Sequence, residues 1–201
     1  MKRGLRFSTI LILVVMLVAG SVFATTFRRA IMAPNMESEI TTSDQEAAYT
    51  ARPQGSPERL IIPTIGVDAV VQHVGVGKSG NMAVPTNYTD VGWYRYGPQP
   101  GDRGTAVFDG HLDNGLGLQG VFSRLRLLNP GDVIFVKTDR EVHVQFRVTH
   151  TDRVSADLSS TGSIFNESGN PQIKLITCEG EWDPETKSYS NRLIVTAERV
   201  S

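Results

Sequence analysis

The chain has 201 residues, of which 40% are hydrophobic and 20% charged, a composition normal for one globular domain with an additional tail. The formal net charge is −1, and no lysine- or arginine-rich block lies outside the N-terminus, so nothing indicates a nucleic-acid partner. The single cysteine, Cys178, excludes an internal disulfide framework and any metal motif built from cysteine pairs.

Residues 1–27 are predicted to form a membrane signal. Three basic residues within the first six precede an uncharged, mainly apolar stretch from Phe7 to Phe27, and about 20 apolar residues are enough for a helix to cross the hydrocarbon core. An uncleaved anchor is one interpretation. A cleaved secretory signal is the other, because Val22-Phe23-Ala24 resembles a small-residue cleavage site. Both interpretations export the remainder of the chain.

Residues 28–57 are predicted to be a flexible linker. Three prolines, a polar run from Thr41 to Glu46 and little periodic apolar content are typical of a solvated tether. A short helix from Ser38 to Tyr49 is the alternative.

From residue 58 onward the pattern changes to short strands separated by turns. Glycine and proline mark the breaks, as in Asn129-Pro130-Gly131-Asp132, and Val121–Leu128 is predicted to form a helical turn. Many strands at short spacing with almost no long helix predict an all-β fold, closed or nearly closed into a barrel. The predicted strands are Arg59–Ile62, Ala69–Val74, Thr105–Phe108, Val133–Val136, Val142–Thr149, Ile173–Thr177 and Arg192–Glu198.

His111 is a candidate functional residue because of its position. It follows the apolar strand Thr105–Phe108 and the turn-forming Asp109-Gly110. A histidine at a strand end, in a polar loop that contains glycine, is typical of a side chain presented to a cleft. The other three histidines, His73, His143 and His150, are explained by solvent exposure or by their places in strands and turns.

Cys178 ends the predicted strand Ile173–Thr177 and is followed by a predicted turn, Glu179-Gly180-Glu181. A strand end beside a turn can present a thiol to a cleft, whereas the alternative is a small buried hydrophobic residue. An unpaired thiol in an exported protein is exposed to oxidation and needs a reason to persist. A zinc site from His111, Asp113 and Cys178 lacks paired ligand spacing, so no metal and no cofactor are predicted.

Three segments resemble the signature segments of the sortase family, in the family's order. They are Gly110-His111-Leu112-Asp113, Leu175-Ile176-Thr177-Cys178 and Asn191-Arg192-Leu193-Ile194-Val195. The resemblance extends from about Arg59 to Val200. Details such as Pro100-Gly101-Asp102 and Gly110-His111-Leu112-Asp113 look closest to the class of sortases often called F. The resemblance implies a closed β-barrel of about eight strands with short helical turns over residues 58–201, preceded by an N-terminal membrane helix.

The resemblance implies Cys178 as nucleophile, His111 as acid and base, and Arg192 as stabiliser of the oxyanion. An isolated thiol with a pKa near 8.5 is only about 3% ionised at pH 7, and a neighbouring imidazole can take its proton. Arginine stays protonated and offers several N–H donors in one plane; the alternative for Arg192 is a surface residue paired with Glu181 or Glu198. The residues expected to contribute to the oxyanion or substrate site are Thr177, Glu179, Asp113 and Asn191.

The function implied is that of a cysteine transpeptidase that cleaves a sorting signal of the Leu-Pro-x-Thr-Gly type through a thioester. The acyl group would pass to an amine of a cell-wall precursor or a pilin. The resemblance places the enzyme in a bacterial cell membrane as a single-pass protein, with its catalytic domain on the extracytoplasmic face. Its partners would be surface proteins with sorting signals and the amine acceptor. The expected groove walls are Val84–Tyr88, Trp93 and Glu181–Asn191, but packing in the core or in a turn explains Trp93 and Trp182 equally well.

Two other functions fit the same sequence. One is a hydrolytic cysteine peptidase with the same three residues, which would release a free acid even when an amine is abundant. The other is a non-catalytic surface β-barrel that binds partners, in which case Cys178→Ala would leave function intact.

Overall fold

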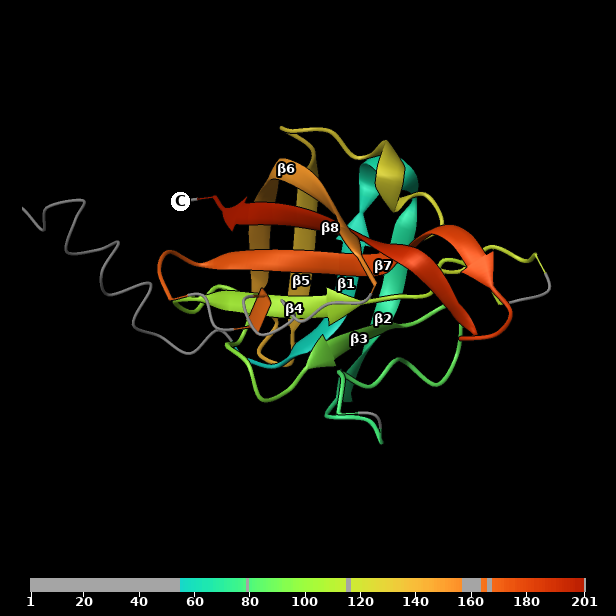
Figure 1. Cartoon of the computed structure of the whole chain (residues 1–201). Coiled ribbons are helices and arrows are strands. Elements are labelled where there is room, and N and C mark those ends of the chain that lie inside the picture. Colours follow the sequence, from blue (N-terminus) through green and yellow to red (C-terminus); the bar gives the residue numbers. More distant parts are fainter. Residues whose placement is uncertain (1–54, 79, 115–116, 157–163, 166–167, 201) are drawn as a thin grey trace, which may run out of the picture. The chain divides into compact units, whose positions relative to one another are not determined.

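The computed structural model describes residues 55–78, 80–114, 117–156, 164–165 and 168–200 (Figure 1). The predicted membrane signal and residues 28–54 of the predicted linker lie outside this range. The chain divides into two compact units, 1–41 and 42–201, and all described residues belong to the second. Within these residues, no helix has the length and apolar character needed to cross a membrane.

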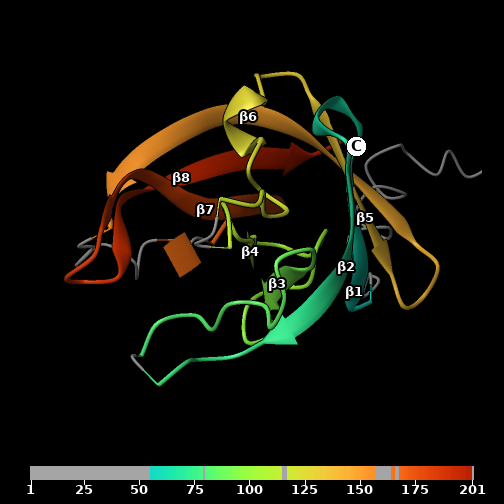
Figure 2. The ribbon, with the colours of Figure 1, turned by 90° about the vertical axis from the view of Figure 1, so that its right-hand side faces the viewer.

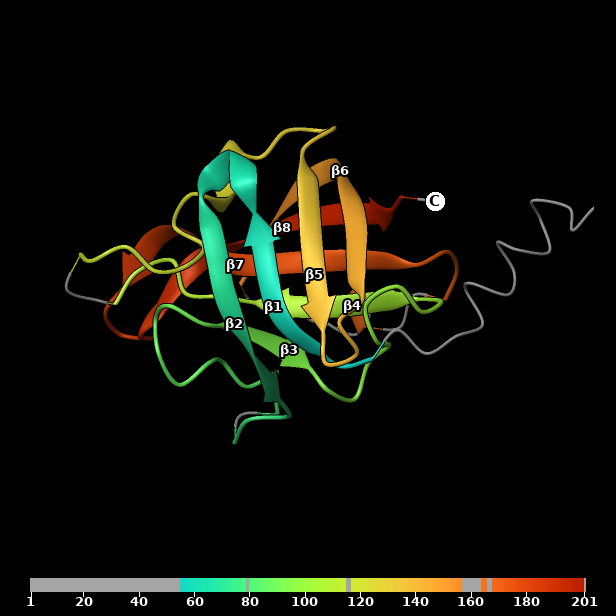
Figure 3. The same cartoon turned by 180° about the vertical axis from the view of Figure 1, so that it is seen from behind.

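The described residues form eight strands that close into a barrel in the order β1-β2-β3-β4-β7-β8-β6-β5. Figures 1 and 3 show the barrel from opposite sides, and in Figure 2 β7 and β8 lie across from β1 and β2. The predicted all-β barrel is therefore confirmed. The elements are β1 (Pro57–Ile62), the 3-10 turn η1 (Pro63–Ile65), β2 (Val67–Val74), β3 (Val91–Tyr94), β4 (Thr105–Asp109), the 3-10 turn η2 (Leu125–Leu127), β5 (Val133–Thr138), β6 (His143–Ser155), β7 (Gln172–Asp183) and β8 (Ser188–Arg199).

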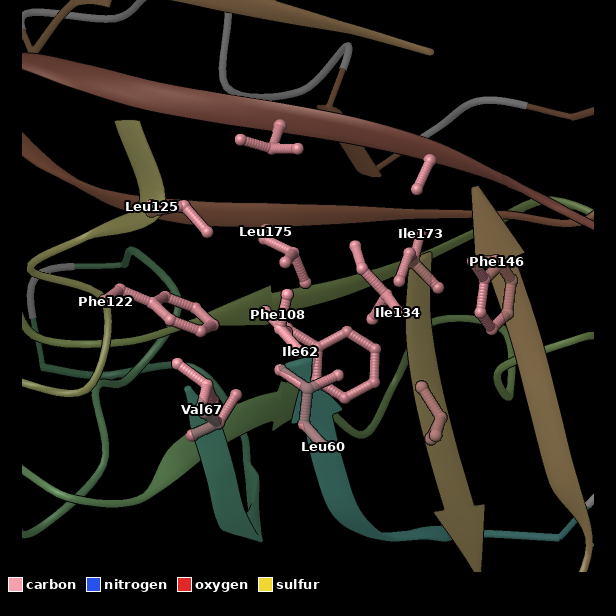
Figure 4. Packing of buried hydrophobic residues seen from close by; sticks show 14 of the residues in the cluster. Leu60, Ile62, Val67, Phe108, Phe122, Leu125, Ile134, Phe146, Ile173 and Leu175 are labelled. Atoms are coloured by element: carbon pink, nitrogen blue, oxygen red, sulfur yellow. The ribbon is translucent and has the colours of Figure 1, made fainter. Parts of the chain in front are cut away.

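Alternating side chains turn each strand's apolar face into the barrel. In β1, Leu60 and Ile62 are fully buried, and in β5 Ile134 and Val136 are fully buried as well. Large side chains from several elements, Phe108 of β4 and Phe146 of β6 among others, meet in this core (Figure 4). Burying each such side chain stabilises the fold by about 1.5–3 kcal/mol, so the core fixes which face of every strand points outward.

The same alternation defines a second, smaller apolar cluster on the opposite face of β4 and β8. Phe108 belongs to the core, but its neighbour Val107 packs with Ile164 and Ile194 outside it. Successive side chains of a strand point to opposite faces. The outer face of β4, β7 and β8 is therefore apolar as well, and this face carries the candidate site.

Candidate active site

A cavity of about 620 Å³ opens beside β4, β7 and β8, and His111, Cys178 and Arg192 all line it. Residues from the segments after β2 and β6, together with Tyr94 at the end of β3, complete its walls. The other lining residues are Val76, Gly80, Asn81, Met82, Val84, Tyr94, Asp109, Gly110, Ala156, Ile164, Phe165, Ile176 and Thr177. Three side chains that lie far apart in the sequence thus face one space.

Cys178 and Arg192 are brought together by the register of β7 and β8. In this antiparallel pair they lie directly opposite each other, which places their Cβ atoms about 4.5–5.5 Å apart on the same face. Inward residues of β7 such as Leu175 and Thr177 are buried, whereas Ile176 and Cys178 are half-buried on the outer face. The thiol therefore faces the cavity rather than the core.

The predicted turn directly after Cys178 is wrong, because β7 continues to Asp183. Its pairing with β8 shifts between Glu179 and Trp182, and Gly180 adopts a φ of 90° there. A Cβ at Gly180 would collide with the Ser190 hydroxyl. A glycine with positive φ in a register shift is the mark of a β-bulge rather than a turn. The thiol therefore sits within the strand, immediately before a bulge.

His111 reaches the cavity because its loop is tied to β7. β4 and β7 are parallel neighbours in which Asp109 pairs with Ile176. The Gly110 amide then donates to the Ile176 carbonyl at 3.1 Å, and the Thr177 hydroxyl donates to the Gly110 carbonyl at 2.7 Å. These two bonds fix the residue before His111 against the strand that carries Cys178.

The His111 imidazole is oriented by its surroundings. Its Nε2 lies 3.2 Å from the Pro85 carbonyl oxygen, and the ring centroid is 4.7 Å from that of Tyr88. A carbonyl oxygen only accepts hydrogen bonds, so Nε2 is the donor and Nδ1 of a neutral ring is left as the basic nitrogen. Behind the residue, the Phe122 amide donates to the His111 carbonyl at 3.0 Å.

Arg192 is held by three hydrogen bonds within its own hairpin. Its Nη1 donates to the carbonyls of Tyr189 at 3.0 Å and Asn191 at 2.9 Å, and its Nη2 donates to the Ser188 hydroxyl at 3.1 Å. All three partners are neutral, whereas the alternative of a surface arginine required an ion pair with Glu181 or Glu198. The guanidinium is thus fixed in place while its full positive charge stays in the cavity.

The pKa of Cys178 is raised, above all by burial of the thiol. The Arg192 guanidinium counteracts this and lowers the pKa, whereas the Asp113 carboxylate raises it further, as does Asp109 when it is ionised. The thiol alone is therefore ionised to a smaller extent than a free cysteine. Efficient attack then requires a base beside it, and His111 is the imidazole that lines the same cavity.

Asp109 is a cavity residue that the sequence analysis missed as a functional group. Burial raises the pKa of its carboxyl to about 8, and its buried Oδ1 has no hydrogen-bond partner among the described residues. The sequence placed Asp109 in a turn, where a carboxylate is expected to be solvated. The Asp109 carboxyl packs against Gly92 of the neighbouring strand. Nothing in the sequence around either residue indicates this contact.

The structure assigns definite places to the four residues predicted for the oxyanion or substrate site. Thr177 is 4% exposed and bonded to Gly110. Glu179 lies 2.8 Å from Arg153 in an ion pair whose geometry is not that of a hydrogen bond, and the Asn191 side chain packs beside Gly180. Asp113 accepts a short hydrogen bond from Tyr189. Of these four residues, Thr177 lines the cavity.

Of the predicted groove walls, Val84 lines the cavity, and Pro85 and Tyr88 contact His111. Trp93 is only 4% exposed and belongs to the core, so the core-packing alternative is confirmed and Trp93 is not a groove wall. Trp93 lies on β3, a strand too short to be recognised from the sequence, and packs into the core. In the described part of the chain, no group of three or more His, Cys, Asp or Glu side chains could hold a metal ion.

Comparisons with known proteins agree with this architecture. A model of the sortase domain matches residues 60–200, while a comparison with curated proteins found no match. The structure of sortase C-1 from Actinomyces oris is similar, at 26% identity with a TM-score of 0.56, covering 78% of this chain and 82% of that one.

Two further structures share the fold. Listeria monocytogenes sortase A is 18% identical with a TM-score of 0.53, covering 71% of this chain and 86% of that one. A Clostridium perfringens sortase D5 transpeptidase is 17% identical with a TM-score of 0.53, covering 80% of this chain and 90% of that one. Because the family model matches well over half of its length, the chain belongs to the sortase family and is a cysteine transpeptidase.

Proposed function

We propose that this sortase cleaves a sorting signal of the Leu-Pro-x-Thr-Gly type between threonine and glycine, with Cys178 as nucleophile. The observation that carries the proposal is the meeting of Cys178, His111 and Arg192 at one cavity. The acyl group passes to an amine of a cell-wall precursor or a pilin. Each role follows from the chemistry of the residue and from its surroundings.

Acylation begins when the Cys178 sulfur attacks the threonine carbonyl carbon. The thiol proton moves to the free Nδ1 of His111, since Nε2 is engaged with Pro85. As the C–N bond breaks, the same proton is returned to the leaving amine, which departs with the glycine-containing fragment. A thioester between Cys178 and the threonine carbonyl remains.

Arg192 stabilises the tetrahedral intermediate. Three of its five N–H groups are used within the hairpin, and the remaining two are available to an oxyanion beside Cys178. The backbone N–H of Glu179 is the proposed second donor. One such donor contributes about 3 kcal/mol, or on the order of a hundredfold or more in rate.

Transfer reverses these steps with a different amine. His111 takes a proton from the incoming amine as its nitrogen attacks the thioester carbon, and returns it to the sulfur as the C–S bond breaks. A thioester stays open to amines, which suits a cysteine to transfer. The apolar walls of the cavity, including Met82, Val84 and Ile176, support binding of the apolar residues that precede the cleaved bond.

The wider assignment is also a proposal. The motif details support class F, although the similar solved structures described above are named as sortases A, C and D. Residues 1–27 would anchor the enzyme in a bacterial membrane, residues 28–57 would act as tether, and residues 58–201 would form the extracytoplasmic catalytic domain. The basic start and the apolar stretch that follows it support this order.

The test is incubation of the detergent-solubilised full chain with a library of sorting-signal peptides and an amine, read by mass spectrometry. A covalent adduct on Cys178 that the amine converts into a ligated peptide is the expected result. Free acid as the main product at saturating amine would contradict transfer and indicate a hydrolase. No adduct with any peptide, together with unchanged surface binding by Cys178→Ala, would indicate a non-catalytic barrel.

A further inference from the structure

Tyr189 on β8 makes two hydrogen bonds that lead to two different parts of the site. Its hydroxyl donates a short hydrogen bond to Oδ2 of Asp113. Its backbone carbonyl accepts from Nη1 of Arg192 at 3.0 Å. One residue thus contacts both the loop that carries His111 and the guanidinium opposite Cys178.

Asp113 is well placed to transmit this contact to His111. It lies two residues after His111 and pairs with Gln119 in an isolated β-bridge. Gly120 then donates to the Leu112 carbonyl at 2.8 Å. The His111 loop is therefore a small closed unit, and Tyr189 joins it to the β7–β8 hairpin.

The phenol of Tyr189 is itself held in place. The Trp182 ring lies 5.2 Å from its centroid at an interplanar angle of 65°, an edge-on arrangement across the bulge of β7. The hydrogen bond to Asp113, together with burial, raises the pKa of Tyr189 to about 12. The hydroxyl therefore remains a donor over the whole working pH range of a thiol–imidazole enzyme.

The same contact affects the charge near the thiol. The Asp113 carboxylate raises the pKa of Cys178, and a phenol that donates to that carboxylate disperses part of its charge. Removing the hydroxyl and removing the charge should thus act on the thiol in opposite directions. A mere loss of stability would not shift the pKa of Cys178 in opposite directions in the two kinds of variant.

We propose that Tyr189 is a positioning residue that fixes His111 relative to Arg192. Its hydroxyl donates a hydrogen bond to Asp113, and its backbone carbonyl accepts one from Arg192. The inference rests on the proposed roles of His111 and Arg192. It predicts that breaking the hydroxyl contact impairs ligation while the Cys178 thiolate, once formed, still reacts with small alkylating reagents, because that reaction needs neither an acid–base catalyst nor an oxyanion donor.

The experiment compares Tyr189→Phe, Asp113→Ala and Asp113→Asn in the full chain. Tyr189→Phe and Asp113→Ala should each lower the kcat of ligation by about tenfold or more, with a smaller change in KM. Asp113→Asn, whose amide oxygen can still accept from Tyr189, should lose less. The double variant Tyr189→Phe/Asp113→Ala should be no worse than the poorer single variant.

The second readout is the pH dependence of Cys178 alkylation. Tyr189→Phe should shift the midpoint to higher pH, and both Asp113 variants should shift it to lower pH. Tyr96→Phe, which removes an exposed hydroxyl bonded to Arg95, is the matched control and should change neither readout. Thermal melting confirms that each variant is folded.

Unchanged kcat in folded Tyr189→Phe would overturn the inference, as would additive losses in the double variant. Alkylation midpoints that move together in Tyr189→Phe and Asp113→Asn would also overturn it. All these outcomes leave the proposed function intact, which fails separately if Cys178→Ala still ligates peptides.

Discussion

The carboxyl group of Asp109 occupies the space over Gly92 that a side chain would fill. The two residues pair across β3 and β4, and a Cβ added at Gly92 would collide with Oδ1 of Asp109. The Pro85 ring and a Val74 methyl group lie against the same point. A carboxyl enclosed in this way is costly to ionise, so its protonation state depends on whether the protein is folded.

Asp109→Asn should therefore change how stability depends on pH. Burial raises the pKa of Asp109 to about 8 in the folded protein, against about 3.9 for an unfolded aspartate. Between these values the folded state keeps a proton that the unfolded state has released, so the contribution of Asp109 falls as pH rises, by at most about 1.4 kcal/mol per pH unit. This contribution is complete below about pH 4 and lost once pH passes about 8.

The measurement is the free energy of unfolding by urea at pH 5, 7 and 9 for both proteins. All other titrating groups are shared, so the difference in the free energy of unfolding isolates Asp109. This difference should move in favour of the variant with each increase in pH. Glu58→Gln, on an exposed carboxylate of β1, is the control. A constant difference between wild type and Asp109→Asn across the series would show that Asp109 is ionised throughout.

The barrel could be predicted because its strands alternate. Val144, Phe146 and Val148 of β6 point into the core between polar neighbours, and this period-two pattern survives in a single sequence. β3 was missed since its four residues include Gly92 and show no alternation. It is held by ladders to β2 and β4 rather than by its own pattern.

The candidate site was predictable where short motifs carry it, and not where distant side chains complete it. Cys178, His111 and Arg192 each lie in a recognisable segment. Tyr189 meets Asp113 across 76 residues of sequence, and neither neighbourhood indicates the other. The extension of β7 beyond Cys178 was missed for a local reason, because a glycine at a bulge and a glycine in a turn look alike in sequence.

Gly120→Ala should impair catalysis by displacing His111. Gly120 is buried, and a Cβ there would collide with the backbone carbonyl group of His111, which cannot move without moving the imidazole. Overpacking of this kind costs about 1–3 kcal/mol. The ligation kcat should also fall by at least tenfold.

Gly97→Ala is the matched control for this change. A Cβ at Gly97 would make only ordinary contacts at 3.5 Å or more, so ligation and melting temperature should stay close to those of the wild type. If Gly120→Ala ligated peptides at the wild-type rate, the loop would be shown to accommodate the methyl group, and the tight packing behind His111 would be irrelevant to catalysis.

Thr177→Val should destabilise the protein although it preserves the shape of the side chain. The Thr177 hydroxyl donates to the Gly110 carbonyl at 2.7 Å in a buried setting, and losing a buried partner costs about 1–3 kcal/mol. Urea denaturation of wild type and variant measures this cost. Thr64→Val, which loses an exposed hydrogen bond to Asp132, should cost much less; equal costs would mean that the tie to Gly110 contributes nothing special.

Substitutions of Arg192 should separate its charge from its geometry. Arg192→Lys keeps a positive charge opposite Cys178 but cannot reproduce the three bonds to Tyr189, Asn191 and Ser188. The pH midpoint of Cys178 alkylation should then stay near the wild-type value. Arg192→Gln should raise this midpoint, because the guanidinium lowers the pKa of the thiol.

Ligation should respond differently from alkylation. Both Arg192→Lys and Arg192→Gln should lose on the order of a hundredfold in kcat, since lysine lacks the planar set of donors and glutamine lacks the positive charge that together stabilise the oxyanion. Arg147→Lys, on an exposed arginine of β6 whose Nη1 donates to the Gly131 carbonyl, provides the control. A fully active Arg192→Lys would show that charge alone suffices, and the hairpin bonds that hold the guanidinium would then have no part in the chemistry.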